Sequence, residues 1–325
     1  MTRINIDGVQ NVEVSKPIPC EKTPKEQLEI MEAYTKAHKD SESLSKAQRE
    51  LNCLKVIYPT MFRSIEDTDL FAGRLDFLPI GFGSVTSIGG VGHYCVFHKL
   101  RAFKEQLDDP NDHKRVDALY DYWQDHDVKA IYCQDILTED TTGRFIDCAY
   151  PFMATARLSG MMLDYNKLMY YGVNGLIDMM KSLKQNDFIQ ASIGCMELFK
   201  KVILRQVELV EQAYENTTND TRRKELDLMK EDLLYIADNK PQTFHQALQL
   251  FWLYALCAGC INYGRMDIVL GPYLKKDIDE GRLDEETAYL YIKSLWKMIE
   301  NRRTTVNGRI IVGGKGRKNV EACDL

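Results

Sequence analysis

Apolar residues recur at helical spacing throughout the second half of the chain. Six segments carry them broadly at positions i, i+3 and i+4, which is the pattern of helices with one buried face. These segments are residues 165–184, 187–214, 221–237, 243–256, 269–280 and 284–300. Asn239-Lys-Pro separates the third from the fourth, and Asp284 is a suitable N-cap for the last.

The first half mixes helical patterns with extended and glycine-rich segments. A helix is predicted to begin at Thr23-Pro24, with Leu28, Met31, Ala33 and Tyr34 on one side, because threonine caps helices and proline suits the first turn. A second starts at residue 43 or 45 and ends at Tyr58, before Pro59. Residues 69–79 are predicted to be extended, 81–92 a glycine-rich loop, 97–107 and 115–125 helical, and 150–159 an irregular connection. Arg309-Ile-Ile-Val is the best strand candidate, so the predicted class is helix-rich α/β.

Composition narrows the functional class. The chain has 325 residues, a net charge of −6 and a pI near 5.6, which argues against nucleic-acid binding. The longest apolar run, 247–261, is too short to cross a bilayer and contains Gln249. The first residues lack the apolar region of a signal peptide, so we expect a cytoplasmic protein.

The nine cysteines are scattered and odd in number, which is typical of reduced thiols. Cys257 and Cys260 form a CxxC pair, but a zinc site would need a second pair of ligands. Two buried helix cysteines are the favoured interpretation, and we expect no metal.

Other motifs do not name a reaction. The glycine-rich loop and Gly313-Gly-Lys-Gly-Arg-Lys both lack the spacing of a P-loop. His93 and His98 flank Cys95, which fits a polar pocket lining, an isolated metal-site fragment or an ordinary loop. His245, at a helix start, is predicted to be structural.

Three stretches together resemble the pyruvate formate-lyase domain of glycyl radical enzymes. The first runs from Asn239-Lys-Pro-Gln-Thr-Phe-His-Gln-Ala-Leu-Gln through Asn262-Tyr-Gly-Arg-Met-Asp to Glu280-Gly-Arg-Leu, with Gln246 where the family usually has glutamate. The second is Asp164-Tyr-Asn-Lys-Leu-Met-Tyr-Tyr-Gly. Four residues before this stretch, Gly160 stands where many relatives have a histidine that contacts substrate in diol dehydratases. The third is Asp69-Leu-Phe-Ala-Gly-Arg-Leu.

This resemblance implies the first half of a ten-stranded α/β barrel with surrounding helices. In the family a glycyl radical near the C-terminus oxidises a cysteine inside the barrel, and the resulting thiyl radical attacks the substrate. An S-adenosylmethionine-dependent iron–sulfur activating enzyme installs the radical, so no bound cofactor is expected. The implied reactions are radical C–C or C–O cleavage, of the formate acetyltransferase or dehydratase type, in anaerobic metabolism. The expected partners are a small-molecule substrate, the activating enzyme and a second subunit in a homodimer.

Five residues are predicted to line the substrate side: His93, Tyr94, Cys260, Asn262 and Arg265. His93 is included because of its glycine-rich context, whereas Cys260 and Asn262 precede the Gly-Arg-x-Asp motif, where the resemblance implies small polar residues at the pocket wall. Arg265 and Asp267 fit equally well a structural ion pair.

The domain organisation is predicted as an N-terminal extension, 1–22, followed by an incomplete pyruvate formate-lyase-like domain, 23–325. The family's cysteine and glycine loops have no match here, and Cys323 lacks their context. We therefore expect no catalytic residue in this chain and an inactive fragment. A non-catalytic helical partner or scaffold protein is the alternative.

Overall fold

A computed structural model describes residues 19–81, 94–127, 162–260, 262–302, 308–317 and 319–324. The predicted N-terminal extension up to residue 18, the glycine-rich loop from residue 82, His93 and the 150–159 connection lie outside these residues. The elements are α1 (Pro24–Asp40), α2 (Lys46–Ile57), α3 (Phe97–Lys104), α4 (Pro110–His126), α8 (Tyr165–Lys181), α9 (Asp187–Asn216), α10 (Asp220–Asp238), α11 (Phe244–Cys257), β1 (Asn262–Arg265), α12 (Met266–Asp279), α13 (Glu285–Asn301), β2 (Arg309–Ile311) and α14 (Val320–Cys323).

The predicted helices are confirmed, with corrections at some of their ends. α4 begins at Pro110, after an Asp109 cap, five residues before the predicted start. α12 begins at Met266 rather than at residue 269. Two elements were not predicted, the strand β1 and the short helix α14. Cys257 ends α11, whereas Cys260 lies beyond it because Gly259 takes a positive φ of 61° and ends the helix.

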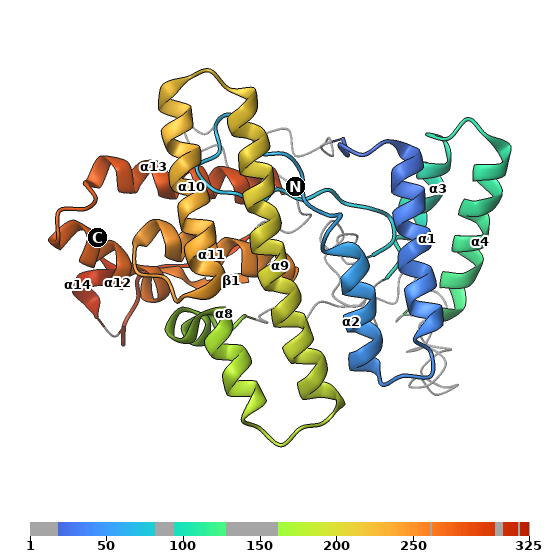
Figure 1. The fold of residues 1–325 in the computed structure, drawn as a ribbon, viewed down its shortest axis with the longest axis horizontal. Helices are drawn as coiled ribbons and strands as arrows, with labels where there is room; N and C mark the ends of the chain where they lie inside the picture. Colours follow the sequence, from blue (N-terminus) through green and yellow to red (C-terminus); the bar gives the residue numbers. More distant parts are fainter. Residues whose placement is uncertain are drawn as a thin grey trace.

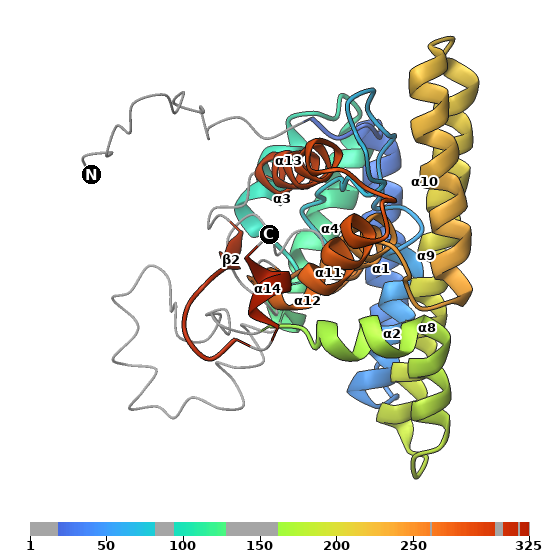
Figure 2. The same cartoon turned by 90° about the vertical axis from the view of Figure 1, so that its left-hand side faces the viewer.

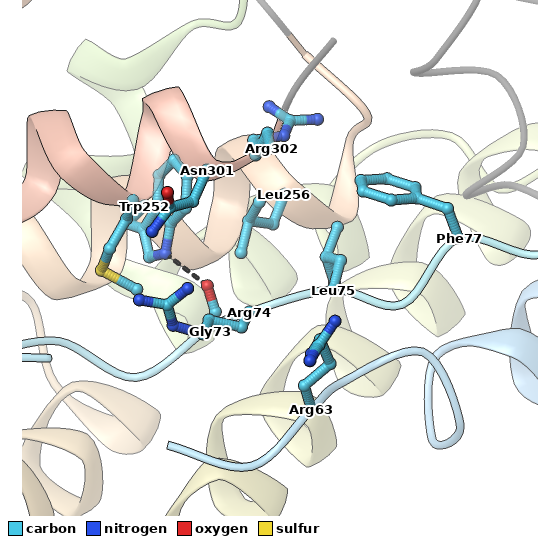
Figure 3. A pocket seen from close by; sticks show the side chains of 10 residues that line it. Arg63, Gly73, Arg74, Leu75, Phe77, Trp252, Leu256, Asn301 and Arg302 are labelled. Carbon is cyan, nitrogen blue, oxygen red and sulfur yellow. Dashed lines mark hydrogen bonds between the residues drawn. The ribbon is translucent and has the colours of Figure 1, made fainter. Parts of the chain in front are cut away.

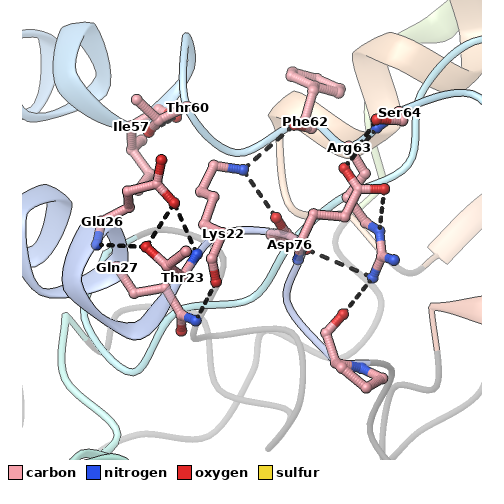
Figure 4. Close-up of polar contacts among 12 residues, drawn as sticks. Lys22, Thr23, Glu26, Gln27, Ile57, Thr60, Phe62, Arg63, Ser64 and Asp76 are labelled. Atoms are coloured by element: carbon pink, nitrogen blue, oxygen red, sulfur yellow. Dashed lines mark hydrogen bonds and ion pairs between the residues drawn. The ribbon is translucent and has the colours of Figure 1, made fainter. Parts of the chain in front are cut away.

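The N-terminus of α1 is fixed by local capping and by one long-range ion pair (Figure 4). Thr23 caps the helix, as predicted, and it also forms a capping box with Glu26. Lys22 Nζ donates to Asp76 Oδ2 at 2.8 Å, which ties the helix to the extended segment that follows α2. Asp76 is buried, and Arg63 also approaches it.

The helices form two groups joined by a long hairpin. α1 to α4 lie together at one end of the molecule, and α11 to α14 lie at the other (Figure 1). α9 and α10 pack side by side as the hairpin, α9 also packs on α2 and α8, and α10 packs on α11 (Figure 2). No helix in the described part of the chain is long and apolar enough to cross a membrane.

α11 is the central helix of the core. Thirteen of its fourteen residues are buried, so it is covered on nearly all sides. Its polar side chains hold the backbone of the extended segment: Gln249 exchanges two hydrogen bonds with Ala72, at 2.8 and 3.0 Å, and Trp252 Nε1 donates to Gly73 O at 2.7 Å. These bonds satisfy backbone groups of the extended segment at Ala72 and Gly73.

His245 and Gln246 secure the start of α11. His245 contacts Asp232 through Nδ1 at 2.7 Å and Leu70 O through Nε2 at 2.9 Å, which supports the predicted structural role. Gln246 Nε2 donates to Asp232 Oδ1 at 2.7 Å. A glutamate here would place a second carboxylate against Asp232, which the glutamine amide avoids.

β1 and β2 form a parallel pair. Asn262 is in register with Arg309, Gly264 with Ile310 and Arg265 with Ile311, with an irregularity between Asn262 and Gly264. α12 and α13 connect the two strands, as is usual for parallel neighbours. The fold class is therefore helix-rich α/β with few strands in the described residues.

Candidate substrate-binding site

The β1 strand brings together three of the five predicted site residues, Cys260, Asn262 and Arg265. Gly264, inside β1, has a φ of +61°, and a Cβ there would lie 1.9 Å from Met162 Sδ. The glycine therefore allows the strand to turn and lets the segment before α8 approach it closely.

Cys260 is buried beside the beginning of β1. Its thiol donates to Asn262 O at 3.0 Å, and its carbonyl accepts from Arg302 Nη1 at 2.7 Å. Burial raises the pKa of the Cys260 thiol, so the protonated form is favoured. A neutral thiol is a hydrogen-bonding group rather than a nucleophile or a metal ligand.

Arg265 joins β1 to the glycine-rich segment after β2. Its Nε and Nη2 donate to the two carboxylate oxygens of Asp267, at 3.1 and 3.0 Å, and Nη2 also donates to Gly313 O at 2.9 Å. Asp267 in turn accepts from Gly313 N at 2.9 Å. Burial opposes ionisation, but these hydrogen bonds hold the pKa of Asp267 below its usual value. The ion-pair alternative is thus present, and a substrate contact by Arg265 stays a prediction.

Asn262 makes a local turn. Its Oδ1 accepts from Gly264 N at 3.1 Å, and the side chain is half-buried. The Oδ1 contact leaves the amide nitrogen available for other partners.

Tyr94 belongs to a different cluster. Its ring packs against His38, Tyr34 and Trp123 at centroid distances of 5.2, 6.4 and 5.1 Å, and its hydroxyl bonds Glu50. These neighbours lie on α1, α2 and α4, whereas the contacts of Cys260 and Arg265 lie around the strand pair. His93 lies outside the described residues, so its predicted place beside Tyr94 is not tested.

Three residues missed by the sequence predictions complete the environment of Cys260. Arg302 Nη1 donates to the Tyr263 hydroxyl at 2.8 Å as well as to Cys260 O. The Tyr165 ring stacks on Phe251 at 4.1 Å, and its hydroxyl faces the Cys260 thiol. Tyr263 lies inside the quoted Asn262-Tyr-Gly-Arg motif and Tyr165 inside the quoted Asp164-Tyr-Asn-Lys motif, so both had a signal in the sequence; nothing in the pattern marks Arg302.

A cavity of about 470 Å³ lies between α2, α8, α9 and α11. Its lining is mostly apolar and includes Met179, Met180 and Phe199. Tyr58, which also lines it, donates to Cys257 O at 2.7 Å. This cavity offers few polar groups that could orient a hydroxylated substrate.

Metal binding finds no support in the part of the chain that the structure describes, where no group of three or more histidine, cysteine, aspartate or glutamate side chains could hold an ion. Cys95 is buried, and burial raises the pKa of its thiol; His98 is exposed on α3.

Comparison with known proteins identifies the family. The family model described as pyruvate formate lyase-like matches residues 3–323, so the chain belongs to this family. A (2S)-3-sulfopropanediol dehydratase from Klebsiella oxytoca is 28% identical over 306 residues, which are 84% of this chain and 36% of that relative. A trans-4-hydroxy-L-proline dehydratase from Clostridioides difficile is 29% identical over 128 residues, 37% of this chain and 16% of the relative.

The fold is also that of a glycyl radical enzyme. The glycerol-bound structure of the B12-independent glycerol dehydratase from Clostridium butyricum superposes with a TM-score of 0.69 at 18% identity. The match covers 88% of this chain and 38% of that structure. The chain therefore spans somewhat more than a third of the length of the sulfopropanediol dehydratase and of the glycerol dehydratase, and it matches the N-terminal portion of such enzymes.

Proposed function

We propose that this chain forms the N-terminal part of a glycyl radical dehydratase or lyase, which removes a leaving group from a small hydroxylated substrate. The observation that carries the proposal is the alignment with the sulfopropanediol dehydratase over 84% of the chain, together with the family match over residues 3–323. Because the chain spans 36% of that relative, the activity is proposed for the whole protein to which these residues contribute.

The dehydratase type is favoured over the formate acetyltransferase type. The two relatives compared by sequence are both dehydratases, of a sulfopropanediol and of trans-4-hydroxy-L-proline. Both substrates carry a hydroxyl group that can leave as water. Radical C–C cleavage of the formate acetyltransferase kind has no comparable support among them.

The residues around β1 would bind and orient the substrate. Cys260, kept neutral by burial, and Asn262 would hydrogen-bond hydroxyl groups, and the Arg265–Asp267 pair would hold the strand in place. Tyr94, whose ring and hydroxyl contacts lie on α1, α2 and α4, and His93, which lies outside the described residues, remain predicted substrate contacts. Reactive radicals need a site that excludes water and oxygen, and the buried position of Cys260 and Tyr263 suits that requirement.

Activation would come from outside this chain. An S-adenosylmethionine-dependent iron–sulfur enzyme would generate the glycyl radical in the whole protein, which we propose to act as a cytoplasmic homodimer under anaerobic conditions.

The test is anaerobic activation of the whole protein. Electron paramagnetic resonance should show a glycyl radical after incubation with the activating enzyme and S-adenosylmethionine. Products should then form from propane-1,2-diol, (2S)-3-sulfopropanediol or trans-4-hydroxy-L-proline. A stable radical without product from any hydroxylated substrate would count against the dehydratase type. Failure to form a radical at all would leave the non-catalytic partner role.

A further inference from the structure

Arg302 is a buried cation at the end of α13. Its side chain and backbone are only 8% exposed. Nη1 donates to Cys260 O at 2.7 Å and to the Tyr263 hydroxyl at 2.8 Å. Nε and Nη2 are also buried, and neither has a hydrogen-bond partner. One edge of the guanidinium is therefore hydrogen-bonded, and the other is buried without a hydrogen-bond partner.

The edge without hydrogen-bond partners is the one formed by Nε and Nη2. Nε–H and the adjacent Nη2–H point in the same direction and form the side-on fork that binds both oxygens of a carboxylate. Among the described residues, three other arginines use this fork on both oxygens of one carboxylate: Arg74 with Asp69 at 2.6 and 2.7 Å, Arg115 with Glu32 at 2.8 and 2.6 Å, and Arg265 with Asp267. Arg282 uses it on one oxygen of Asp277.

No described carboxylate compensates the charge of Arg302. It forms no ion pair with any aspartate or glutamate in the part of the chain that the structure covers. The other buried arginines do: Arg74 pairs with Asp69 and Glu66, and Arg222 with Glu225. A buried guanidinium cannot lose its proton, so burial without a counter-ion is costly.

The neighbouring groups do not supply a negative charge. Burial raises the pKa of the Tyr165 and Tyr263 hydroxyls and of the Cys260 thiol, so all three are neutral near pH 7. They surround Arg302 with polar, uncharged groups that could hydrogen-bond a ligand.

Arg302 also lines one end of a small cavity, with Gly73 and Arg74 at the other end (Figure 3). The cavity volume of about 20 Å³ is enough for one water molecule. Water would satisfy an N–H group but would leave the charge uncompensated.

We propose that the Nε/Nη2 fork of Arg302 binds an oxyanion of a small substrate, a carboxylate or a sulfonate. The charge of Arg302 anchors this anion, and the groups around Cys260 contact the rest of the molecule. This inference rests on the proposed function, because it assigns an anionic class to the substrate of the same site.

The test measures anion binding by the full 325-residue chain and needs no radical. Acetate and methanesulfonate are titrated at constant ionic strength set with chloride, with acetamide as the neutral probe. Calorimetry and the fluorescence of the tryptophans, of which Trp252 lines the same cavity, report binding. We expect saturable binding of both anions and none of acetamide.

Variants locate the anion. Arg302→Gln should weaken binding by at least tenfold. Arg302→Lys, which keeps the charge without the fork, should weaken it several-fold. Arg205→Gln is the matched control, because it removes one exposed arginine, which lies on α9 and pairs with Glu208. This variant should bind the anions as the unchanged chain does. Near-ultraviolet circular dichroism checks folding, and Arg302→Lys keeps the test informative if the glutamine variant unfolds.

Two results would overturn the inference. Equal binding by Arg302→Gln would place the anion elsewhere, and absence of binding by the unchanged chain would mean that the fork holds only water or a carboxylate from another part of the protein. The two proposals fail separately. Anion binding without any glycyl radical in the whole protein would contradict the proposed enzyme function and support the anion subsite at Arg302. Turnover of propane-1,2-diol without anion binding would support the enzyme function and contradict the subsite.

Discussion

Two buried arginines at opposite ends of one small cavity differ in how their charge is treated. Arg74 and Arg302 are 9% and 8% exposed, and both line the cavity (Figure 3). Nε and Nη2 of Arg74 donate to Asp69, while the same two nitrogens of Arg302 have no hydrogen-bond partner. Equal burial thus accompanies two roles: a completed ion pair that holds the fold, and an incomplete one that is suited to a ligand.

The α1–α4 group shows a third solution. His38 is 1% exposed and sits among aromatic rings, with Nδ1 bonded to the Tyr122 hydroxyl at 2.8 Å. Burial, with smaller contributions from Arg49 and His126, lowers the pKa of His38 to about 4. A histidine can therefore enter the core without charge, which an arginine cannot do.

Breaking the Arg74–Asp69 ion pair should have the largest effect on the free energy of unfolding. Arg74→Met leaves Asp69, which is buried, without its partner, and we expect a loss of about 3–5 kcal/mol in the free energy of unfolding. Urea denaturation followed by circular dichroism measures it. Arg63→Met, which removes a partly exposed arginine at the same cavity, serves as the control; an Arg74→Met loss below that of the control would contradict the structural role.

Gly73 should tolerate no side chain. Its φ is +118°, and a Cβ would lie 2.9–3.0 Å from Leu253, Leu256 and Trp252. Gly73→Ala therefore combines backbone strain with overpacking, for an expected loss of about 2–4 kcal/mol. Gly281→Ala is the matched control, since its φ is also positive, at 68°, but a Cβ there meets nothing within 4 Å. Thermal unfolding of the two variants separates strain from crowding, and equal losses would rule out crowding at Gly73.

Local signals explain which parts of this structure could be predicted from sequence. The starts of α1 and α11 follow from Thr23 with Glu26 and Thr243 with Gln246, because each capping box involves residues only three apart. β1 was missed because it is short, contains Gly264 and pairs with a strand two helices later. Gly259 was a readable helix stop that would have placed Cys260 outside α11.

The site was only partly predictable for the same reason. Cys260, Asn262 and Arg265 are close in sequence, so one motif brought them together. The burial of Arg302 depends on how the end of α13 meets Cys260 and Tyr263, about 40 residues earlier. No periodicity in the chain encodes that contact, and Arg302 looks like an ordinary charged residue at a helix end.

Acid should weaken the α1–α4 group through His38. Its pKa in the folded state, about 4, lies below the usual 6.5, so the unfolded chain binds the extra proton first. Stability is then fully present above pH 6.5 and is lost as the pH falls from 6.5 towards 4, by roughly 1–3 kcal/mol. Urea midpoints between pH 4 and pH 7 measure this slope. His38→Gln should flatten it; an unchanged slope in this variant would assign the effect to other groups.

Gln246→Glu should restore the family's usual residue at a cost in stability. The glutamine amide donates to Asp232 at 2.7 Å, and the replacement sets two carboxylates together in a buried place. We expect a loss of about 1–2 kcal/mol at pH 7. Combining it with Asp232→Asn should recover most of the loss in a double-mutant cycle. Purely additive effects would show that the two positions do not interact.

Arg302→Met should change stability least, and this sharpens the contrast with Arg74. The substitution removes two hydrogen bonds from Nη1, to Cys260 O and the Tyr263 hydroxyl, but it also removes an uncompensated buried charge. The two effects oppose each other, so the free energy of unfolding should stay within about 1 kcal/mol of the unchanged chain. Urea denaturation of Arg302→Met and Arg74→Met under the same conditions compares their free energies of unfolding. A loss as large as that of Arg74→Met would mean that Arg302 already has a counter-ion in solution and holds the fold as Arg74 does. A small change would show that the chain keeps Arg302 buried for a reason other than stability, as a ligand anchor requires.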